Sequence, residues 1–314
     1  MKTQISPNRS SGFTLIELMV AMAITAVIVT VLVSITGVAL DTWQRGRSEI
    51  RASRQARSML DTMAKDFESL VARRGNNFEW LYSKIESELP GPVSNPSSNA
   101  AELIFFTAAT DRYAGEIGGP NDKGGDVSCV AYKLEYQDPV SGKEEESSSA
   151  FVLYRLLVNP DESFKDLMGK DNLQTAFSSY SNKVSEVENF VCENVYQFTL
   201  TYQVEVSQSS GSGATAKTTI VPVRVTLGDS AAGKEFRLSG KGITTDASAS
   251  GIKPAVTVDE LKAGRLTGVE IGITVISDSA AVRLAVPGLS EKVREKILAQ
   301  DSFQYSRVVA LPGM

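Results

Sequence analysis

The sequence contains no histidine. Because histidine is the commonest general base and the commonest metal ligand near neutral pH, its absence excludes Ser-His-Asp and Cys-His catalysis and most zinc sites. No phosphate-binding glycine loop or nucleotide fingerprint is present either. Carboxylate-only chemistry remains open, but no catalytic constellation indicates an enzyme.

Cysteine is also scarce, and acidic residues outnumber basic ones, 37 to 32. The two cysteines, Cys129 and Cys192, form no CxxC pair, which excludes a zinc or redox motif of that kind. Their even number allows one disulfide in an exported domain, and two buried free thiols are the alternative. The net charge of −5 and pI of about 5.1 leave no overall basic field, so we expect no nucleic-acid partner.

One long apolar run is present, from Phe13 to Leu40, and its only charged residue is Glu17. A helix needs about 20 apolar residues to cross a bilayer, and this run is long enough. It is too long for the apolar region of a secretory signal, and no small-residue cleavage site follows it. We therefore expect a membrane segment over residues 13–40. A carboxylate inside such a segment suggests a function, with snorkelling to the headgroups as the alternative.

The residues around Glu17 resemble a known motif. The block GFTLIELMVAMAI, which starts at Gly12, resembles the prepilin cleavage and methylation motif of type IV prepilin-like proteins. The resemblance implies that a prepilin peptidase removes the leader 1–12 by cutting between Gly12 and Phe13, and methylates the new amine of Phe13. It also implies that Glu17 acts in assembly, because its carboxylate would pair with that amine in the filament core, where an unpaired charge is costly.

The same resemblance implies a single-pass inner-membrane protein with a cytoplasmic N-terminus and a periplasmic C-terminal domain. Its partners would be the peptidase, other pilin or pseudopilin subunits, the inner-membrane assembly platform and the lipid bilayer. The positive-inside rule favours the opposite orientation. Only Lys2 and Arg9 precede the span, whereas five arginines follow it, Arg45, Arg47, Arg51, Arg54 and Arg57. Because the motif requires a cytoplasmic N-terminus, we expect that orientation.

Beyond the span, residues 41–74 predict a continuation of the helix as the spine of an exported β-rich domain, 75–314. One arc of this helix is apolar, the pattern of a helix packed on a core. Its residues are Ala52, Ala56, Leu60, Met63, Ala64, Phe67, Leu70 and Val71. Strand signals cover 103–107, 127–136, 151–158, 198–206, 221–227 and 269–276, and a short helix is expected over 290–300. The pattern predicts an α+β, pilin-like fold: one long helix on an antiparallel sheet.

Four segments, 102–107, 130–135, 153–157 and 221–227, resemble in order those of J-type minor pseudopilins of type II secretion. A Verru_Chthon cassette prepilin-like protein is a second possible relative. Ser34 stands where many major pilins have proline, which favours a minor subunit. A major fibre subunit and a membrane-tethered enzyme or binding domain are the alternatives. We expect no cofactor. Calcium is the one ion that the acidic loop of Asp111, Glu116, Asp122 and Asp126 would suit, and a solvated loop is the other interpretation.

Overall fold

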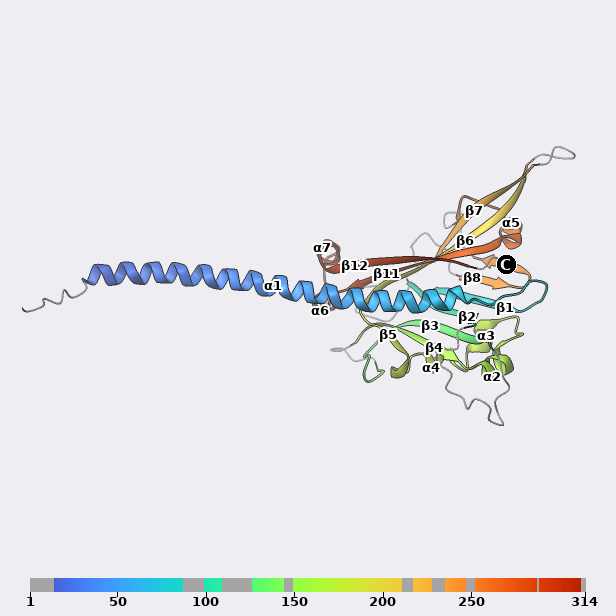
Figure 1. Cartoon of the computed structure of the whole chain (residues 1–314), viewed down its shortest axis with the longest axis horizontal. Helices are drawn as coiled ribbons and strands as arrows, with labels where there is room; N and C mark the ends of the chain where they lie inside the picture. The colour runs from blue at the N-terminus through green and yellow to red at the C-terminus, as the bar shows by residue number, and fades with distance from the viewer. Residues whose placement is uncertain are drawn as a thin grey trace, which may run out of the picture. The chain divides into compact units, whose positions relative to one another are not determined.

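The computed structural model describes residues 14–86, 99–108, 126–143, 149–210, 217–227, 235–246, 252–286 and 288–311. The chain divides into two compact units, residues 1–50 and 51–314. Helix α1 (Leu15–Glu68) begins in the first unit and ends in the second. It is long and apolar enough to cross a membrane (Figure 1).

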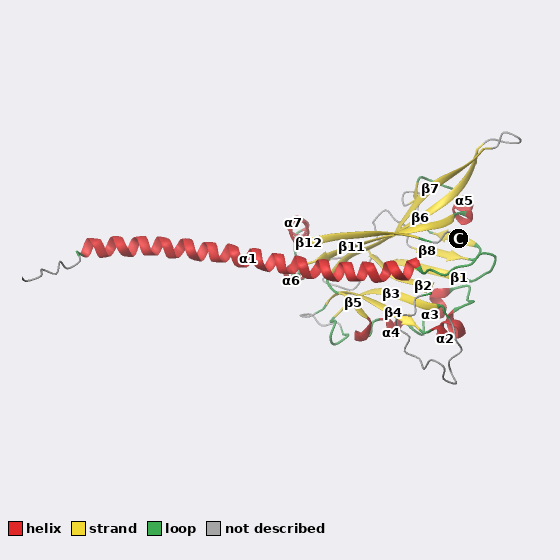
Figure 2. Ribbon diagram, in the orientation of Figure 1, coloured by secondary structure: helices red, strands yellow, loops and turns green. Residues whose placement is uncertain are grey.

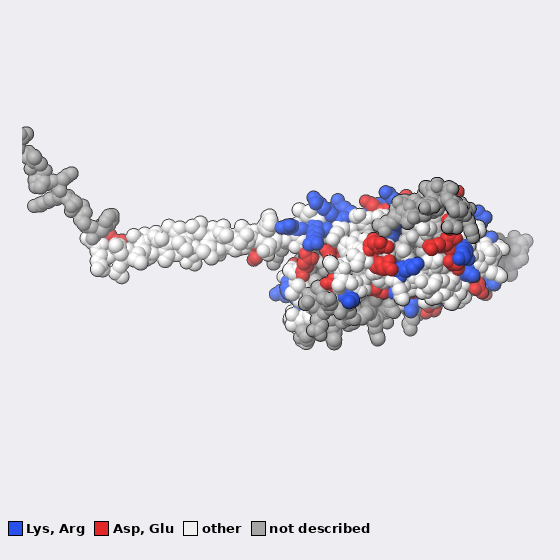
Figure 3. Space-filling model, turned by 90° about the horizontal axis from the view of Figure 1, so that it is seen from below, with Lys and Arg blue, Asp and Glu red and all other residues white. Residues whose placement is uncertain are grey.

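In the first unit, every side chain from residue 14 to residue 44 is exposed. Residues 15–40 rise about 39 Å at 1.5 Å per residue, which exceeds a hydrocarbon core of about 30 Å. Figure 3 shows this stretch without charge over its middle. Its threonine hydroxyls donate to the carbonyl four residues earlier at 2.8 Å, as Thr25, Thr30 and Thr36 do. Such bonds satisfy the hydroxyls without water, so the helix suits a bilayer.

The second unit contains two antiparallel sheets (Figure 2). The larger has the strand order β5-β4-β3-β2-β1-β8-β9. Its strands are β1 (Glu79–Glu86), β2 (Asn99–Thr107), β3 (Ser128–Gln137), β4 (Ala150–Val158), β5 (Phe190–Cys192), β8 (Glu235–Ser239) and β9 (Gly242–Thr245). The smaller has the order β10-β7-β6-β11-β12. Its strands are β6 (Val195–Ser210), β7 (Lys217–Leu227), β10 (Ile252–Lys253), β11 (Arg265–Ile276) and β12 (Ser302–Ala310).

Short helices complete the second unit. Three of these elements cover one face of the larger sheet: the π-helical turn η1 (Ser163–Leu167), α3 (Leu173–Phe177) and α4 (Ser181–Val184). Helix α2 (Pro160–Glu162) leads directly into η1. A 3-10 turn, η2 (Val187–Asn189), precedes β5. The remaining helices are α5 (Val258–Ala263), α6 (Asp278–Leu284) and α7 (Glu291–Asp301), and α7 confirms the helix predicted at 290–300.

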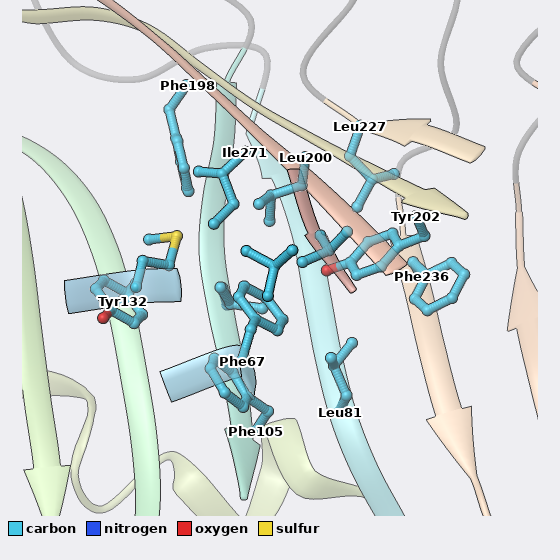
Figure 4. Packing of buried hydrophobic residues seen from close by; sticks show 14 of the residues in the cluster. Phe67, Leu81, Phe105, Tyr132, Phe198, Leu200, Tyr202, Leu227, Phe236 and Ile271 are labelled. Atoms are coloured by element: carbon cyan, nitrogen blue, oxygen red, sulfur yellow. The ribbon is translucent and has the colours of Figure 1, made fainter. Parts of the chain in front are cut away.

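The larger sheet is buried on both faces, because successive side chains of a strand point to opposite sides. One face shares a core with the smaller sheet and the second half of α1. There Phe67 stacks on Phe105 with ring centroids 4.5 Å apart, and Tyr202 stacks on Phe236 at 3.9 Å (Figure 4). The other face packs on the short helices through residues such as Trp80. The smaller sheet leaves its outer face to solvent, with Gln304 and Ser306 among its exposed residues.

The predicted α+β class, the long helix on antiparallel strands and the six predicted strands are confirmed. The predicted apolar arc of α1 is buried, except for the half-buried Val71. However, α1 ends at Glu68 and not near residue 74. Its last turn closes when Leu70 N–H donates to the Phe67 carbonyl at 3.0 Å. Val71 N–H then donates to the Phe106 carbonyl, so the chain joins β2 instead of continuing the helix.

Candidate assembly and processing site

A capping box starts α1. Thr14 N–H and the Thr14 hydroxyl donate to Glu17 Oε2 at 2.9 and 2.8 Å, and Glu17 N–H approaches Thr14 Oγ1 at 3.4 Å. The pattern Thr-x-x-Glu satisfies two of the N–H groups that a helix start leaves without a partner. Gly12 and Phe13, the predicted processing residues, lie outside the described residues. This capping box was not predicted from the sequence, although the spacing of Thr14 and Glu17 indicates it.

Glu17 keeps one carboxylate oxygen available. Its bonds to Thr14 use Oε2, and Oε1 has no partner among the residues that the structure describes. The side chain is exposed at the positive end of the helix dipole, which stabilises a carboxylate there. Glu17 can therefore cap its own helix and accept a hydrogen bond from a nearby cation at the same time.

The other end of α1 carries a buried ion pair. Asp66 accepts from Arg155 Nε at 2.8 Å and from Arg155 Nη2 at 2.7 Å, and Tyr132 O–H donates to Asp66 Oδ2 at 2.5 Å. The relative exposure of Asp66 and of Arg155 is 1%. Burial, and then the neighbouring Asp66 carboxylate, raises the pKa of Tyr132 well above its ordinary value. These hydrogen bonds to Asp66 join α1 to β3 and β4 and position the helix on the sheet.

Neither partner of this ion pair was identified from the sequence, although each carried a signal. Asp66 falls on the apolar arc of α1, three residues after Met63 and beside Phe67. Arg155 is the only charged residue of β4, AFVLYRLLV. An acid on an apolar helix face and a lone cation in an apolar strand predict that the two are paired, because a buried charge needs a partner.

Exposed ion pairs also connect α1 to the rest of the second unit. Arg51 contacts Glu193 at 3.0 Å and Asp278 at 3.3 Å. Arg307 of β12 contacts Asp61 and lies 3.9 Å from Glu68. Such exposed pairs contribute little to stability. They show that the polar side of the helix also contacts its neighbours.

Of the two alternatives that the sequence left open for the cysteines, the structure has the free thiols, because Cys129 and Cys192 are both unbonded and buried. Cys129 pairs across the ladder with Val158 and lies in the core beside the short helices, whereas Cys192 pairs with Leu153 and lies in the core shared with α1. The two thiols thus occupy opposite faces of one sheet, with β4 between their strands. Burial raises the pKa of both, that of Cys192 to about 12.

The predicted acidic loop is mostly outside the described residues, which include only Asp126. Within the described ranges, no group of three or more cysteines and carboxylates is arranged to hold a metal ion. The expectation of no cofactor, and its calcium alternative, therefore stay predictions.

Comparisons with known proteins identify the N-terminal segment. Residues 7–33 match the family model described as the prokaryotic N-terminal methylation motif. No curated protein matches the chain. Among solved structures, a type IV-like pilin from Thermus thermophilus is 10% identical with a TM-score of 0.30, over 83% of this chain and 96% of that one.

Proposed function

We propose that this chain is a structural subunit of a type IV pilus-like filament or type II secretion pseudopilus, and a minor subunit of it. The observation that carries the proposal is the methylation motif at residues 7–33, which coincides with the start of an apolar helix of membrane-spanning length. The absence of histidine from the sequence favours an assembly role over a catalytic one.

Processing by a prepilin peptidase would cut between Gly12 and Phe13, and the new amine would then lie one residue before the cap of α1. Glu17 Oε2 already accepts from Thr14, so Oε1 can accept from that amine or from the amine of a neighbouring subunit. In a filament core of low dielectric the pair favours one axial register, because a carboxylate buried without its partner is strongly destabilising. Glu17 is the proposed assembly residue.

The proposed topology places the N-terminus in the cytoplasm and residues 51–314 outside the inner membrane. The positive-inside rule would place Arg51, Arg54 and Arg57 in the cytoplasm, which is the opposite orientation. These arginines, however, belong to a folded unit and not to a short loop. Long exported domains translocate largely regardless of their charge, which supports the orientation that the motif requires. The partners proposed are the peptidase, the other subunits and the inner-membrane assembly platform.

The minor role is supported by the size and irregularity of the second unit, with its two sheets and its short helices. Helix α1 also passes through Ser34 without interruption, whereas a proline there would remove a backbone hydrogen bond. An uninterrupted helix is what we expect of a minor or pseudopilin subunit.

Intact-mass spectrometry of the protein extracted from its own host membrane tests this proposal. The expected mass is that of residues 13–314 with one added methyl group. The matched variant is Gly12→Leu, whose side chain should block the peptidase and leave the full precursor in the membrane. A parent protein that still begins at Met1 would show that the chain is not processed as a prepilin.

A further inference from the structure

An exposed tryptophan lies just past the apolar run of α1. Trp43 follows Leu40, the last residue of that run, by three positions, and its side chain is 60% exposed. Its indole N–H has no acceptor among the residues that the structure describes. An indole has a large apolar ring with one polar group, and it is favoured where one part of it meets hydrocarbon and the other meets water.

A cation lies over this ring. Arg47 is one helical turn after Trp43, and its guanidinium carbon is 5.5 Å from the ring centroid. At this distance the face of the ring attracts a cation. Because residues three or four apart share a helix face, Ala39 and Leu40 lie next to Trp43 on the side of the apolar run. Along this face the order is therefore an apolar surface, then an indole, then a cation.

No acid within the described ranges neutralises Arg47. A helix neighbour can pair with it only from three or four positions away. These positions hold Trp43, Gln44, Ile50 and Arg51. The nearest acids in the chain, Asp41 and Glu49, lie on other faces of the helix, and no described carboxylate is within ion-pair distance of Arg47. The guanidinium can therefore bind an anion from outside the chain.

The distance from Trp43 to Glu17 matches the thickness of a bilayer. The two residues are 26 positions apart (43 minus 17), a rise of about 39 Å at 1.5 Å per residue. A bilayer measures about 40–45 Å with its headgroup layers, and its hydrocarbon core about 30 Å. With Trp43 in one headgroup layer, Glu17 therefore lies in the other, and neither Glu17 nor Arg47 enters the hydrocarbon.

We propose that Trp43 and Arg47 bind the headgroups of phospholipids at one bilayer surface and so fix the depth of α1, with Glu17 in the opposite headgroup layer. The ring lies among the upper parts of the acyl chains, and the guanidinium binds a phosphate with its paired N–H groups. The proposal rests on the membrane span of the proposed function. It needs neither processing nor a particular orientation.

The order of groups on this face favours a lipid over a protein partner. Since the face continues from the apolar run through Trp43 to Arg47, its partner has to offer hydrocarbon first and an anion directly after it. A phospholipid layer has this arrangement over its whole surface. An acidic protein segment would match Arg47 alone.

The two ends of the span then oppose movement in both directions. A shift of one helical turn, about 5.4 Å, would carry either Arg47 or Glu17 toward the hydrocarbon. A charge in the hydrocarbon is costly. Before any assembly, the carboxylate of Glu17 is thus kept in a hydrated layer, where it needs no counter-charge.

The test uses the full chain in nanodiscs of dioleoyl phosphatidylcholine, which leave both bilayer surfaces open. Lipids brominated near the headgroup end of the acyl chain should quench the tryptophan fluorescence more than lipids brominated near the methyl end. Trp43→Phe should remove this quenching, because the remaining Trp80 is buried. A nitroxide on Leu18→Cys, one residue after Glu17, should be reached by a water-soluble nickel chelate. Cys129 and Cys192 are buried and should stay unlabelled.

The decisive variant is Arg47→Leu, which removes the phosphate contact and lengthens the apolar run. The helix should slide as one body, so strongest quenching should move toward the methyl end and nickel access at residue 18 should rise. Arg47→Lys keeps a cation that reaches the headgroups and should behave like the parent. The double variant Arg47→Gln with Glu49→Gln keeps the net charge, and it should still shift, because Glu49 lies on another face.

Three results would overturn the proposal. The first is Trp43 fluorescence that the brominated lipids do not quench, which would place the ring in water or against another protein. The second is an Arg47→Leu protein with both readouts unchanged. The third is a double variant that behaves like the parent, which would make net charge the cause. The mass of the N-terminus does not enter this assay, so its failure and a failure of the proposed processing are told apart.

Discussion

The two halves of α1 have the same α-helical backbone but lie in different surroundings. Residues 15–40 are apolar around the whole circumference and exposed, whereas residues 51–68 bury one stripe and expose the other. Each half has one acid in an apolar setting, Glu17 in the first and Asp66 in the second. A helix that is apolar on all sides needs a nonaqueous environment, and a striped helix needs only a sheet to cover it.

The carboxylates of Asp66 and Glu17 have different roles. Asp66 has its partners, Arg155 and Tyr132, within the folded unit, so its contribution is to folding. Glu17 contacts Thr14, and one of its oxygens has no partner among the described residues, so its contribution is expected between subunits. Substitutions in the two halves should therefore change different measurements.

The largest expected effect follows from Glu17→Ala. In the proposed filament, removing the carboxylate would leave the Phe13 amine without its partner when subunits dock, so co-purification with the other subunits should be lost. The unfolding of residues 51–314 should be unchanged, and membrane insertion should be as good or better, because the span becomes more apolar. Normal assembly of this variant would contradict the role proposed for Glu17.

Asp66→Asn should lower the free energy of unfolding by about 3–5 kcal/mol, because the buried Arg155 loses its counter-charge. Urea unfolding of the full chain in micelles, followed by the fluorescence of the buried Trp80, measures the change. The double variant with Asp66→Leu and Arg155→Met is the control, and it should recover most of the stability. An Asp66→Asn protein as stable as the parent would show that the ion pair does not hold α1 on the sheet.

A matched pair of alanines gives a smaller effect. Ala56 is fully buried against the sheets, whereas Ala26 is exposed on the apolar half. Ala56→Leu should overfill the core and lower stability by about 1–3 kcal/mol. Ala26→Leu should leave the urea midpoint unchanged. An equal decrease in the urea midpoint for both variants would contradict the difference in burial between the two halves of α1.

The smallest effect concerns a second capping box, Thr257 with Glu260, which repeats the Thr14–Glu17 pattern at the start of α5. The Thr257 backbone N–H, and then its hydroxyl, lowers the pKa of Glu260 below its ordinary value of 4.5. The stabilisation is therefore present above pH 4.5 and is lost as the pH falls through the lowered pKa. The difference in urea midpoint between the parent and Glu260→Gln should shrink on acidification, and a constant difference would contradict this.

Local periodicity predicted much of the fold. The stripe of α1 and the alternation in β6 depend on near neighbours in the chain, which is why both were confirmed. Strand β1, EWLYSKIE, was missed because its charged ends mask a strand that is buried on both faces. Strand β12 was missed because it is an edge strand whose inward residues, apart from Val309, are only partly buried. The predicted end of α1 was late, since a backbone bond to Phe106 competes with the last turn.

The sequence by itself determined the apolar span, the methylation motif and the α+β class, because each of these is a pattern of adjacent residues. Only the tertiary structure decided which distant residues meet. Asp66 and Arg155 are 89 positions apart, and their contact depends on how α1 lies across β4. Cys129 and Cys192 are separated by the direction in which each side chain leaves a shared sheet. The position of β12 at an edge of its sheet likewise follows from strand order, which no local pattern specifies.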